Sequence, residues 1–424
     1  MKSLTLVLVF VCILFITSAS AQQRNVIDDE AKVPEYVVPD VLTRFSGGKV
    51  KSAKVWNTKQ RPEILKKFTE EVYGKVPGNL GITDVKVWET STDALKGKAV
   101  RRQLSLFFRK GNRNLEVNVL MYLPQQQKKV PVFLAYNFTG NHAIINDPNI
   151  RLTEAWVNND PSVGTINNQV TEQSRGSDSN SWPVEEILDA GYGLVTVYYG
   201  EIDPDKDDFA DGIHPFFYQE NQLHPKFDEW GSIAAWAWGL SRVMDYLEKD
   251  ELVDASKVAV LGHSRLGKTA LWAGATDQRF AMVISNESGC GGAALSKRIF
   301  GETVQIINTS FPHWFCGNFK KYNNNESELP VDQHMLLALI APRPLYVASA
   351  EGDKWADPRG EFLAAKYASP VYKLLGKEGL PVTEMPEVNN PVMGTIGYHI
   401  RSGKHDLAEY DWQQYIRFAD KFFK

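Results

Sequence analysis

The fold is decided by residues 257–268, Lys257-Val-Ala-Val-Leu-Gly262-His263-Ser264-Arg265-Leu266-Gly267-Lys268, followed by the helix-forming run 269–273. A short apolar run leads into the pattern G-x-S-x-G. The two glycines permit a tight strand-to-helix turn that lifts the serine clear of the sheet. The backbone amide after the serine then faces a developing oxyanion near a helix N-terminus. This context predicts that Ser264 is a nucleophile. The alternative is a non-catalytic serine in a structural turn.

Strands and helices alternate on both sides of this segment. Three alternating runs come first, and the uninterrupted apolar run 131–136 is typical of a strand buried on both faces. Alternation of this kind predicts a mostly parallel sheet with helices on both faces. We therefore expect an α/β-hydrolase fold, a three-layer sandwich with an antiparallel N-terminal edge. The predicted strands are 83–88, 100–108, 115–123, 131–136, 192–198, 257–261, 282–285 and, as the last, 344–348; the predicted long helices are 230–247 and 410–423.

A long polar stretch, 137–182, separates two of these strands. It is rich in Asn, Ser, Gly and Asp and exceeds the usual length of a loop, and such loops are often functional insertions or lids. No repeat, low-complexity tract or Pro/Ser-rich linker marks a second domain. We expect residues 22–424 to form a single domain that carries this insertion.

The first 21 residues have the layout of a secretory signal peptide. A short positive start precedes the apolar run 4–16, and Ala19-Ser-Ala21 is a small-residue cleavage site. We expect a secreted or periplasmic protein that begins near Gln22 and spans no membrane. The formal net charge of −4 argues against a general nucleic-acid or anionic-membrane binder.

Cysteines are too few for a disulfide scaffold. The chain has three, and Cys12 lies within the predicted signal peptide. Cys290 and Cys316 remain, and they either pair in an oxidising compartment or stay as small buried apolar residues. The sequence leaves both outcomes open.

A serine nucleophile needs a base, which in this fold class follows the serine and the acid along the chain. His405 fits best, because it lies near the C-terminus just before the terminal helix. His313 and His334 precede the last predicted strand and have aromatic or apolar neighbours, so we interpret them as structural. His263 is next to the nucleophile, where we expect its ring to point away from the serine.

Two acids compete to orient the imidazole. Glu287 follows the strand after the serine turn, and Asp353 follows the next long strand. The loop before the histidine is the usual place for this acid, which favours Asp353. Composition does not decide between them.

Several motifs resemble the glucuronoyl esterases of carbohydrate esterase family 15. The most specific are the Ser-Arg-x-Gly-Lys motif at 264–268 and the Glu-Ser-Gly-x-Gly-Gly motif at 287–292. Asp332-x-His334 leading into Ala341-Pro-Arg343 agrees as well, and Val72-Tyr-Gly74 agrees more weakly. The resemblance runs from about residue 258 to the C-terminus.

The resemblance implies cleavage of the ester between a glucuronic acid side group of xylan and an alcohol of lignin. It implies that Ser264 is the nucleophile and His405 the base, with Glu287 at the family's acid position and a second acid at Asp353 in bacterial members. It further implies that Arg265 contributes to the oxyanion hole, whose physical alternative is a surface salt bridge. Residues matching positions that hold the sugar hydroxyls are Lys268, Glu302 and Trp355, each with a structural or solvated role as the alternative.

Departures from the fungal pattern limit what the resemblance implies. Fungal members pair two cysteines at the places of His263 and Asp406, so that bridge is absent here. A second sugar-binding glutamate corresponds to Ser310, which leaves the substrate preference open. The long insertion 137–182 and the missing bridge favour a Gram-negative bacterial type.

We therefore expect a serine esterase that acts on 4-O-methyl-glucuronate esters of glucuronoxylan. No metal-binding or nucleotide-binding motif is found, so we expect neither a metal nor an organic cofactor, and we expect a monomer. One alternative is another hydrolase on the same scaffold, such as an acetyl-xylan esterase or a peptidase. The other is a non-catalytic carbohydrate-binding relative.

Overall fold

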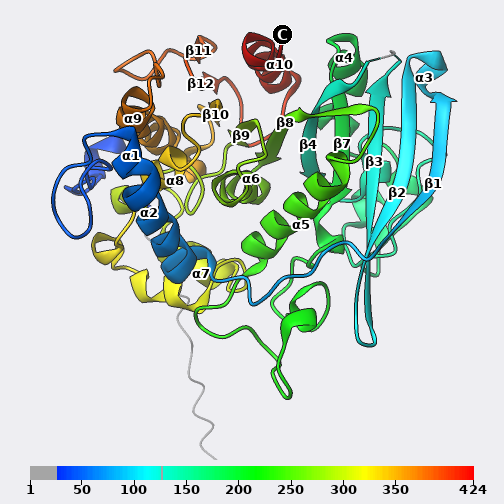
Figure 1. The fold of residues 1–424 in the computed structure, drawn as a ribbon, viewed down its shortest axis with the longest axis horizontal. Coiled ribbons are helices and arrows are strands. Elements are labelled where there is room, and N and C mark those ends of the chain that lie inside the picture. The colour runs from blue at the N-terminus through cyan, green and yellow to red at the C-terminus, as the bar shows by residue number, and fades with distance from the viewer. Residues whose placement is uncertain (1–25, 126–127) are drawn as a thin grey trace, which may run out of the picture.

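A ten-stranded sheet crosses the molecule in the computed structural model, which describes residues 26–125 and 128–424 (Figure 1). The predicted signal peptide, residues 1–21, lies outside the described residues. In the order of the sheet, the strands are β1 (Asp84–Asp93), β2 (Ala99–Lys110), β3 (Arg113–Pro124), β7 (Gly193–Tyr198), β4 (Val130–Asn137), β8 (Val253–His263), β9 (Met282–Asn286), β10 (Leu345–Ala350), β12 (Ile396–Arg401) and β11 (Val392–Met393).

The six strands from β7 to β12 in this order run parallel to one another. Strands β1, β2 and β3 join them through antiparallel pairs, so the predicted antiparallel N-terminal edge is confirmed. The predicted strands correspond to observed ones, with ends that differ by up to five residues.

Strand β12 was not predicted, and the interpretation of 344–348 as the last strand was wrong. The sequence of β12 includes Gly397, His399 and Arg401, so this strand lacks an apolar run. All six of its residues are nevertheless buried. His399 is accommodated because its Nε2 lies 2.8 Å from the Asp411 carboxylate. A buried polar side chain can occupy a central strand when such a partner is present.

Helices cover both faces of the sheet, which makes the predicted three-layer sandwich. Along β4, Val132 and Leu134 belong to one hydrophobic core, whereas Phe133 and Ala135 belong to the other. Alternation of this kind follows from side chains pointing to opposite faces of a strand. Helices α5, α6, α8 and α9 pack in the first core, and α4 and α10 in the second. The helices are α1 (Ala53–Val55), α2 (Arg61–Phe68), α3 (Ala94–Gly97), α4 (Val184–Asp189), α5 (Ser232–Leu247), α6 (Arg265–Thr276), α7 (Val304–Ser310), α8 (Gln333–Ala338), α9 (Pro358–Leu374) and α10 (Glu409–Phe423).

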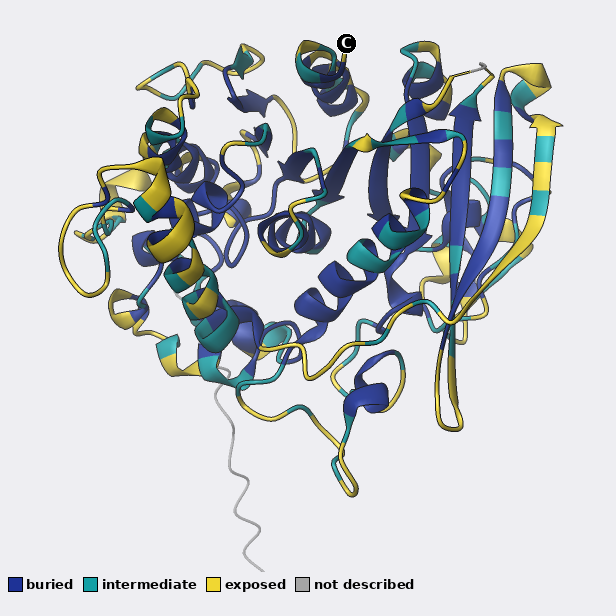
Figure 2. Ribbon diagram, viewed as in Figure 1, coloured by how far each residue is buried: buried dark blue, intermediate teal, exposed yellow. Residues whose placement is uncertain are grey.

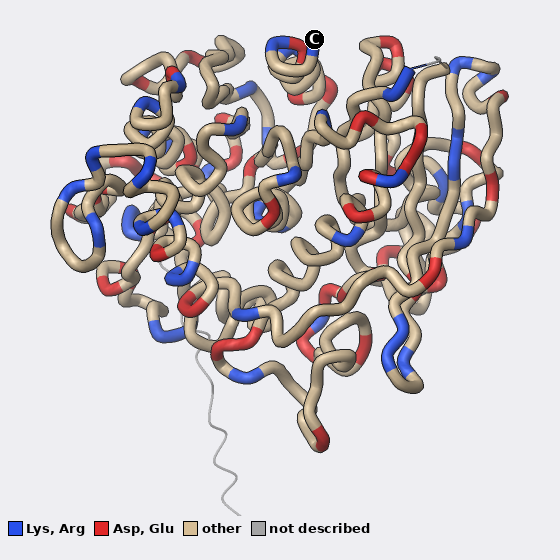
Figure 3. Tube along the Cα trace, viewed as in Figure 1, with Lys and Arg blue, Asp and Glu red and all other residues tan. Residues whose placement is uncertain are grey.

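Burial follows this layering. The central strands and helix α6 are buried, whereas helix α2 and edge strand β1 have exposed faces (Figure 2). Basic and acidic residues are mixed along the outer loops and helices, as expected from the small net charge (Figure 3). Within the described residues, no helix is both long and apolar enough to cross a membrane.

The insertion 137–182 folds over the sheet as a series of short elements. It contains several 3₁₀ turns and a two-stranded hairpin, β5 (Thr165–Ile166) with β6 (Gln169–Val170). Its first residue ends β4, and its last, Trp182, packs on Trp412 of α10 with ring centroids 5.8 Å apart. Both ends of the insertion are thus anchored, which lets the insertion form a fixed wall.

Candidate active site

Ser264 occupies a strained turn between β8 and α6. Its φ of 57° and ψ of −127° are uncommon for a residue with a side chain. A side chain at Gly262 would place its Cβ only 1.9 Å from the carbonyl oxygen of Leu266. One at Gly267 would bring its Cβ to 2.9 Å from the Cβ of Ser288. The turn therefore requires glycine at 262 and close packing at 267, as the G-x-S-x-G pattern indicates.

A cavity of about 350 Å³ opens beside this serine. The sequence analysis singled out eight site residues, and the structure brings all of them to the wall of this one cavity. They are Ser264, Arg265, Lys268, Glu287, Glu302, Asp353, Trp355 and His405. These residues come from segments up to 141 positions apart (264 to 405), so the fold, rather than sequence proximity, assembles the site.

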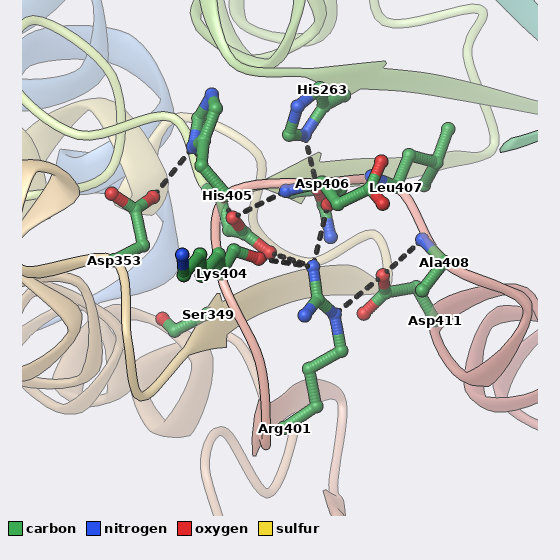
Figure 4. Close-up of polar contacts among 12 residues, drawn as sticks. His263, Ser349, Asp353, Arg401, Lys404, His405, Asp406, Leu407, Ala408 and Asp411 are labelled. Atoms are coloured by element: carbon green, nitrogen blue, oxygen red, sulfur yellow. Dashed lines mark hydrogen bonds and ion pairs between the residues drawn. The ribbon is translucent and has the colours of Figure 1, made fainter. Parts of the chain in front are cut away.

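His405 contacts both candidate acids through the same ring nitrogen. Figure 4 shows its contact with Asp353. Its Nδ1 lies 2.6 Å from Oδ2 of Asp353 and 3.2 Å from Oε2 of Glu287. Although burial lowers the pKa of His405, the two carboxylates raise it to about 9 overall. Because Nδ1 is engaged with the acids, Nε2 is the ring nitrogen that is left to act as a general base.

The two acids have different surroundings. Glu287 is fully buried, and burial raises its pKa to about 7 despite Arg401 and His405. Burial also acts to raise the pKa of Asp353, but the hydrogen bond and charge attraction with His405, together with the Ala356 amide, outweigh it and leave this pKa below its usual value. Asp353 is therefore the ionised partner at the shorter distance, while Glu287 offers a second carboxylate.

Glu287, Asp353 and His405 each offer an atom that could bind a metal ion, and these atoms lie within 4.8 Å of one another. The closeness follows from the hydrogen bond between His405 and Asp353, since a donated proton draws the two atoms together. The expected absence of a metal cofactor stays a prediction.

Arg265 forms an ion pair that the sequence analysis did not foresee. Its Nη1 donates to Oδ2 of Asp205, which is 3% exposed, so the pair is not a surface salt bridge. Asp205 also accepts from the ring nitrogens of His313 and Trp314, each at 2.7 Å. Within the described part of the chain, Nε of Arg265 has no hydrogen-bond partner. The guanidinium is thus anchored by Asp205, and Arg265 lines the cavity beside Ser264.

Asp205 and His313 were missed as site residues. Asp205 lies in an irregular segment with several other aspartates, so no pattern distinguishes it. His313 was interpreted as structural, and its contact with Asp205 places it behind Arg265. The one available signal was that Arg265 needs a carboxylate partner, which could have prompted a search among the aspartates.

Lys268 and Glu302 form a buried charged pair at the cavity wall. The Lys268 Nζ lies 3.7 Å from Glu302 Oε2 and donates to the Ser288 carbonyl oxygen at 2.6 Å. Burial raises the pKa of Glu302. Trp355 is 45% exposed. Charged donors and acceptors beside an exposed aromatic ring suit sugar hydroxyls and a sugar face.

Arg401 at the end of β12 organises the loop that carries His405 (Figure 4). Its Nη2 donates to Glu287 Oε1 at 2.6 Å and to the carbonyl oxygens of Lys404 and Asp406 at 3.0 and 2.8 Å. Its Nε donates to Asp411 Oδ2 at 2.9 Å. This arginine was missed because its strand was missed. An arginine four residues before the candidate base, His405, was the available signal.

The structure also bears on the predictions made for His263 and for the two cysteines. The ring of His263 lies 4.5 Å from the ring of His405, so it is beside the candidate base rather than remote from the site. Its Nδ1 is engaged with Asn286 Oδ1. Cys290 and Cys316 are both free and buried, which decides between the two outcomes that the sequence left open.

Comparisons with known proteins agree with this geometry. The family model described as "Glucuronyl esterase, fungi" matches residues 184–376. A carbohydrate esterase, MZ0003, from an unknown prokaryotic organism is 52% identical over 94% of this chain and 93% of its own. The solved structure of a glucuronoyl esterase from Solibacter usitatus is 50% identical, with a TM-score of 0.87 over 93% of this chain and all (100%) of its own.

A fungal relative covers less of the chain. The 4-O-methyl-glucuronoyl methylesterase 1 of Wolfiporia cocos is 36% identical over 47% of this chain and 54% of its own length. The match to the prokaryotic esterase is both closer and nearly complete. At that identity and coverage, the chain belongs to the glucuronoyl esterases of carbohydrate esterase family 15.

Proposed function

We propose that this chain is a serine esterase that hydrolyses the ester between a 4-O-methyl-glucuronic acid side group of xylan and an alcohol of lignin. The observation that carries the proposal is the single cavity in which a serine on a strained turn meets a histidine with two acids. A buried lysine and glutamate share that cavity. The name of the Wolfiporia relative supports the same substrate class.

The first half of the reaction forms an acyl-enzyme. Ser264 Oγ attacks the C6 ester carbonyl, and His405 takes the hydroxyl proton. The tetrahedral oxyanion is stabilised by the Arg265 guanidinium and by free amides at the N-terminus of α6. The intermediate collapses when the ester C–O bond breaks, and His405 returns the proton to the leaving alkoxide oxygen.

The second half regenerates the serine. Water attacks the acyl carbon while His405 accepts its proton, and the C–Oγ bond breaks as the proton passes to Ser264. Asp353, with Glu287 beside it, orients the imidazole and stabilises its charge. Lys268, Glu302 and Trp355 hold the sugar. No step calls for a metal or organic cofactor.

Export and organisation are part of the proposal. The predicted signal peptide supports a secreted or periplasmic enzyme, and the continuous ten-stranded sheet supports a single domain spanning residues 22–424. We further propose a monomer that binds neither nucleic acid nor membrane.

Hydrolysis of benzyl glucuronate by the purified mature chain tests the proposal, with Ser264→Ala and a chelator-treated sample as controls. We expect turnover by the untreated and chelated wild type and none by the variant. Absence of turnover with a serine that still reacts with a fluorophosphonate would keep the hydrolase and reject the glucuronate substrate. Faster cleavage of acetylated xylan would instead select an acetyl esterase. A serine that does not react with the probe would support the non-catalytic alternative.

A further inference from the structure

A second cavity, of about 280 Å³, meets the first at Ser264 and His405. It lies against the insertion, which contributes residues from both of its ends. The remaining lining comes from β4, β8 and the loop after His405. Its lining residues are Tyr136, Phe138, Asp178, Ser181, Trp182, Leu261, His263, Ser264, His405, Asp406 and Leu407.

The chemistry of the two walls differs. The first cavity contains the charged side chains of Arg265, Lys268 and Glu302. Among its described lining residues, the second has neither lysine nor arginine. Five large apolar or aromatic side chains, among them Phe138 and Trp182, line it together with polar groups that include the carboxylates of Asp178 and Asp406. Burial and the charge of His405 lower the pKa of His263 to about 3, so this imidazole adds no positive charge. The second cavity therefore suits an uncharged, aromatic group.

The aromatic wall is held in place by its surroundings. Trp182 packs on Trp412, whose Nε1 donates to the Ser181 carbonyl oxygen at 2.8 Å. Phe138 packs edge-on against Tyr199, with ring centroids 5.8 Å apart. A wall fixed in this way presents a preformed surface, which reduces the entropic cost of binding a ring.

Asp178 is one of the polar groups that line this cavity beside the aromatic rings. Asp178 accepts a hydrogen bond from Thr139 Oγ1 at 3.1 Å. Burial raises its pKa above the usual value for aspartate. A small number of placed polar groups in an otherwise apolar pocket commonly fixes the orientation of a ligand.

We propose that this second cavity is the subsite for the leaving alcohol and that it selects alcohols with an aromatic ring. The inference rests on the proposed function and names the alcohol side of the same reaction. An ester has two halves that diverge from the carbonyl carbon. When Ser264 attacks that carbon, the acidic sugar lies among the charged side chains. The alkoxy half then extends past His405, which must protonate its oxygen.

Two phenylalanines make a matched pair for the test. Phe138 lines the second cavity and Phe311 the first, and their ring centres lie 5.7 and 5.6 Å from the Arg265 guanidinium carbon. Removal of either ring changes the surroundings of Arg265 similarly. Only removal of the Phe138 ring changes the proposed alcohol subsite.

The experiment compares kcat/KM for benzyl and methyl glucuronate in the wild type, Phe138→Ala and Phe311→Ala. Phe138→Ala should lower the benzyl-to-methyl ratio by roughly tenfold, the scale of one aromatic contact. Phe311→Ala should slow both esters by the same factor. Equal effects of the two variants on the ratio would overturn the inference.

Ser181→Phe provides an independent variant that adds volume instead of removing it. The backbone of Ser181 accepts the Trp412 bond, so the side chain can change while that anchor remains. We expect benzyl turnover to fall more than methyl turnover, and an unchanged ratio would contradict the subsite. If the wild type cleaves neither ester, the proposed function itself is wrong and the inference fails with it; methyl turnover with an unaltered ratio rejects the inference alone.

Discussion

The serine turn, residues 262–268, and the histidine loop, residues 402–408, are positioned in opposite ways. The conformation of the serine turn follows from its own sequence, since Gly262 lies against Leu266 a few residues away. The histidine loop depends on distant groups, because Arg401 joins it to Glu287 and Asp411. The nucleophile is thus placed by local backbone geometry and the base by a long-range network of buried charges. Substitutions in the two regions should therefore have different consequences.

The largest expected effect comes from Ser264→Ala in the serine turn. Removing a nucleophile that acts together with a base typically lowers kcat by roughly a million-fold. The fold should persist, because the turn is set by its glycines and not by the Oγ atom. Turnover of benzyl glucuronate and thermal unfolding together check this expectation. Residual activity within tenfold of the wild type would exclude Ser264 as the nucleophile.

Arg265→Ala should have the next largest effect, a loss in kcat of roughly a hundredfold, the scale of one oxyanion donor. Asp205→Asn is the matched variant, since it weakens the ion pair that anchors Arg265 but keeps the positive charge of Arg265. We expect a smaller loss from it in steady-state assays. Equal losses from both variants would assign Arg265 a structural role, and a change in KM alone would assign it to substrate binding.

Arg401→Met tests the histidine loop. Removing one partner of a buried ion pair typically costs about 3–5 kcal/mol of unfolding free energy, since Glu287 and Asp411 lose their shared cation. Displacement of His405 should also lower kcat by tens of fold, given that a shift of about 1 Å can cost a hundredfold. Denaturant unfolding and steady-state kinetics measure the two effects.

Arg343→Met is the control for this prediction. Arg343 is partly buried and donates to the carbonyl oxygens of Gly274 and Phe280. It lies just before β10 and thus at the opposite end of the parallel strands from His405. The Arg343→Met substitution should lower the free energy of unfolding, but it should not change kcat at temperatures below the unfolding transition. If Arg401→Met also leaves kcat unchanged, Arg401 stabilises the fold but does not position the histidine.

The same contrast explains how much the sequence could predict. Apolar runs and G-x-S-x-G are local signals, so the sheet, Ser264 and the order of the helices followed from them. Strand β12 and Arg401 did not, because a buried polar strand is stable only through partners outside it, such as Asp411 and the distant Glu287. Asp205 was missed for the same reason. Long-range pairing of polar groups leaves no periodic pattern in a sequence.

The choice between Glu287 and Asp353 gives the smallest expected effect and a distinct signature in pH. His405 acts as a base only when neutral, so turnover should fall as the pH drops through its pKa, which the two carboxylates raise to about 9. Asp353→Asn removes the nearer carboxylate, at 2.6 Å, and should lower that pKa. The acid limb of the kcat profile then moves to lower pH. Glu287→Gln removes the partner at 3.2 Å and should shift the limb less.

Because each acid can support the imidazole when the other is lost, each single amide variant should retain activity, with a loss of no more than roughly tenfold. The double variant should lose far more than the product of the two single losses, as expected of groups that act on one histidine. If Glu287→Gln alone abolishes turnover, Asp353 is not part of the catalytic group, and the shorter hydrogen bond serves only to hold the loop. If Asp353→Asn alone does so, Glu287 acts through Arg401 to position the histidine loop, and the base depends on a single acid.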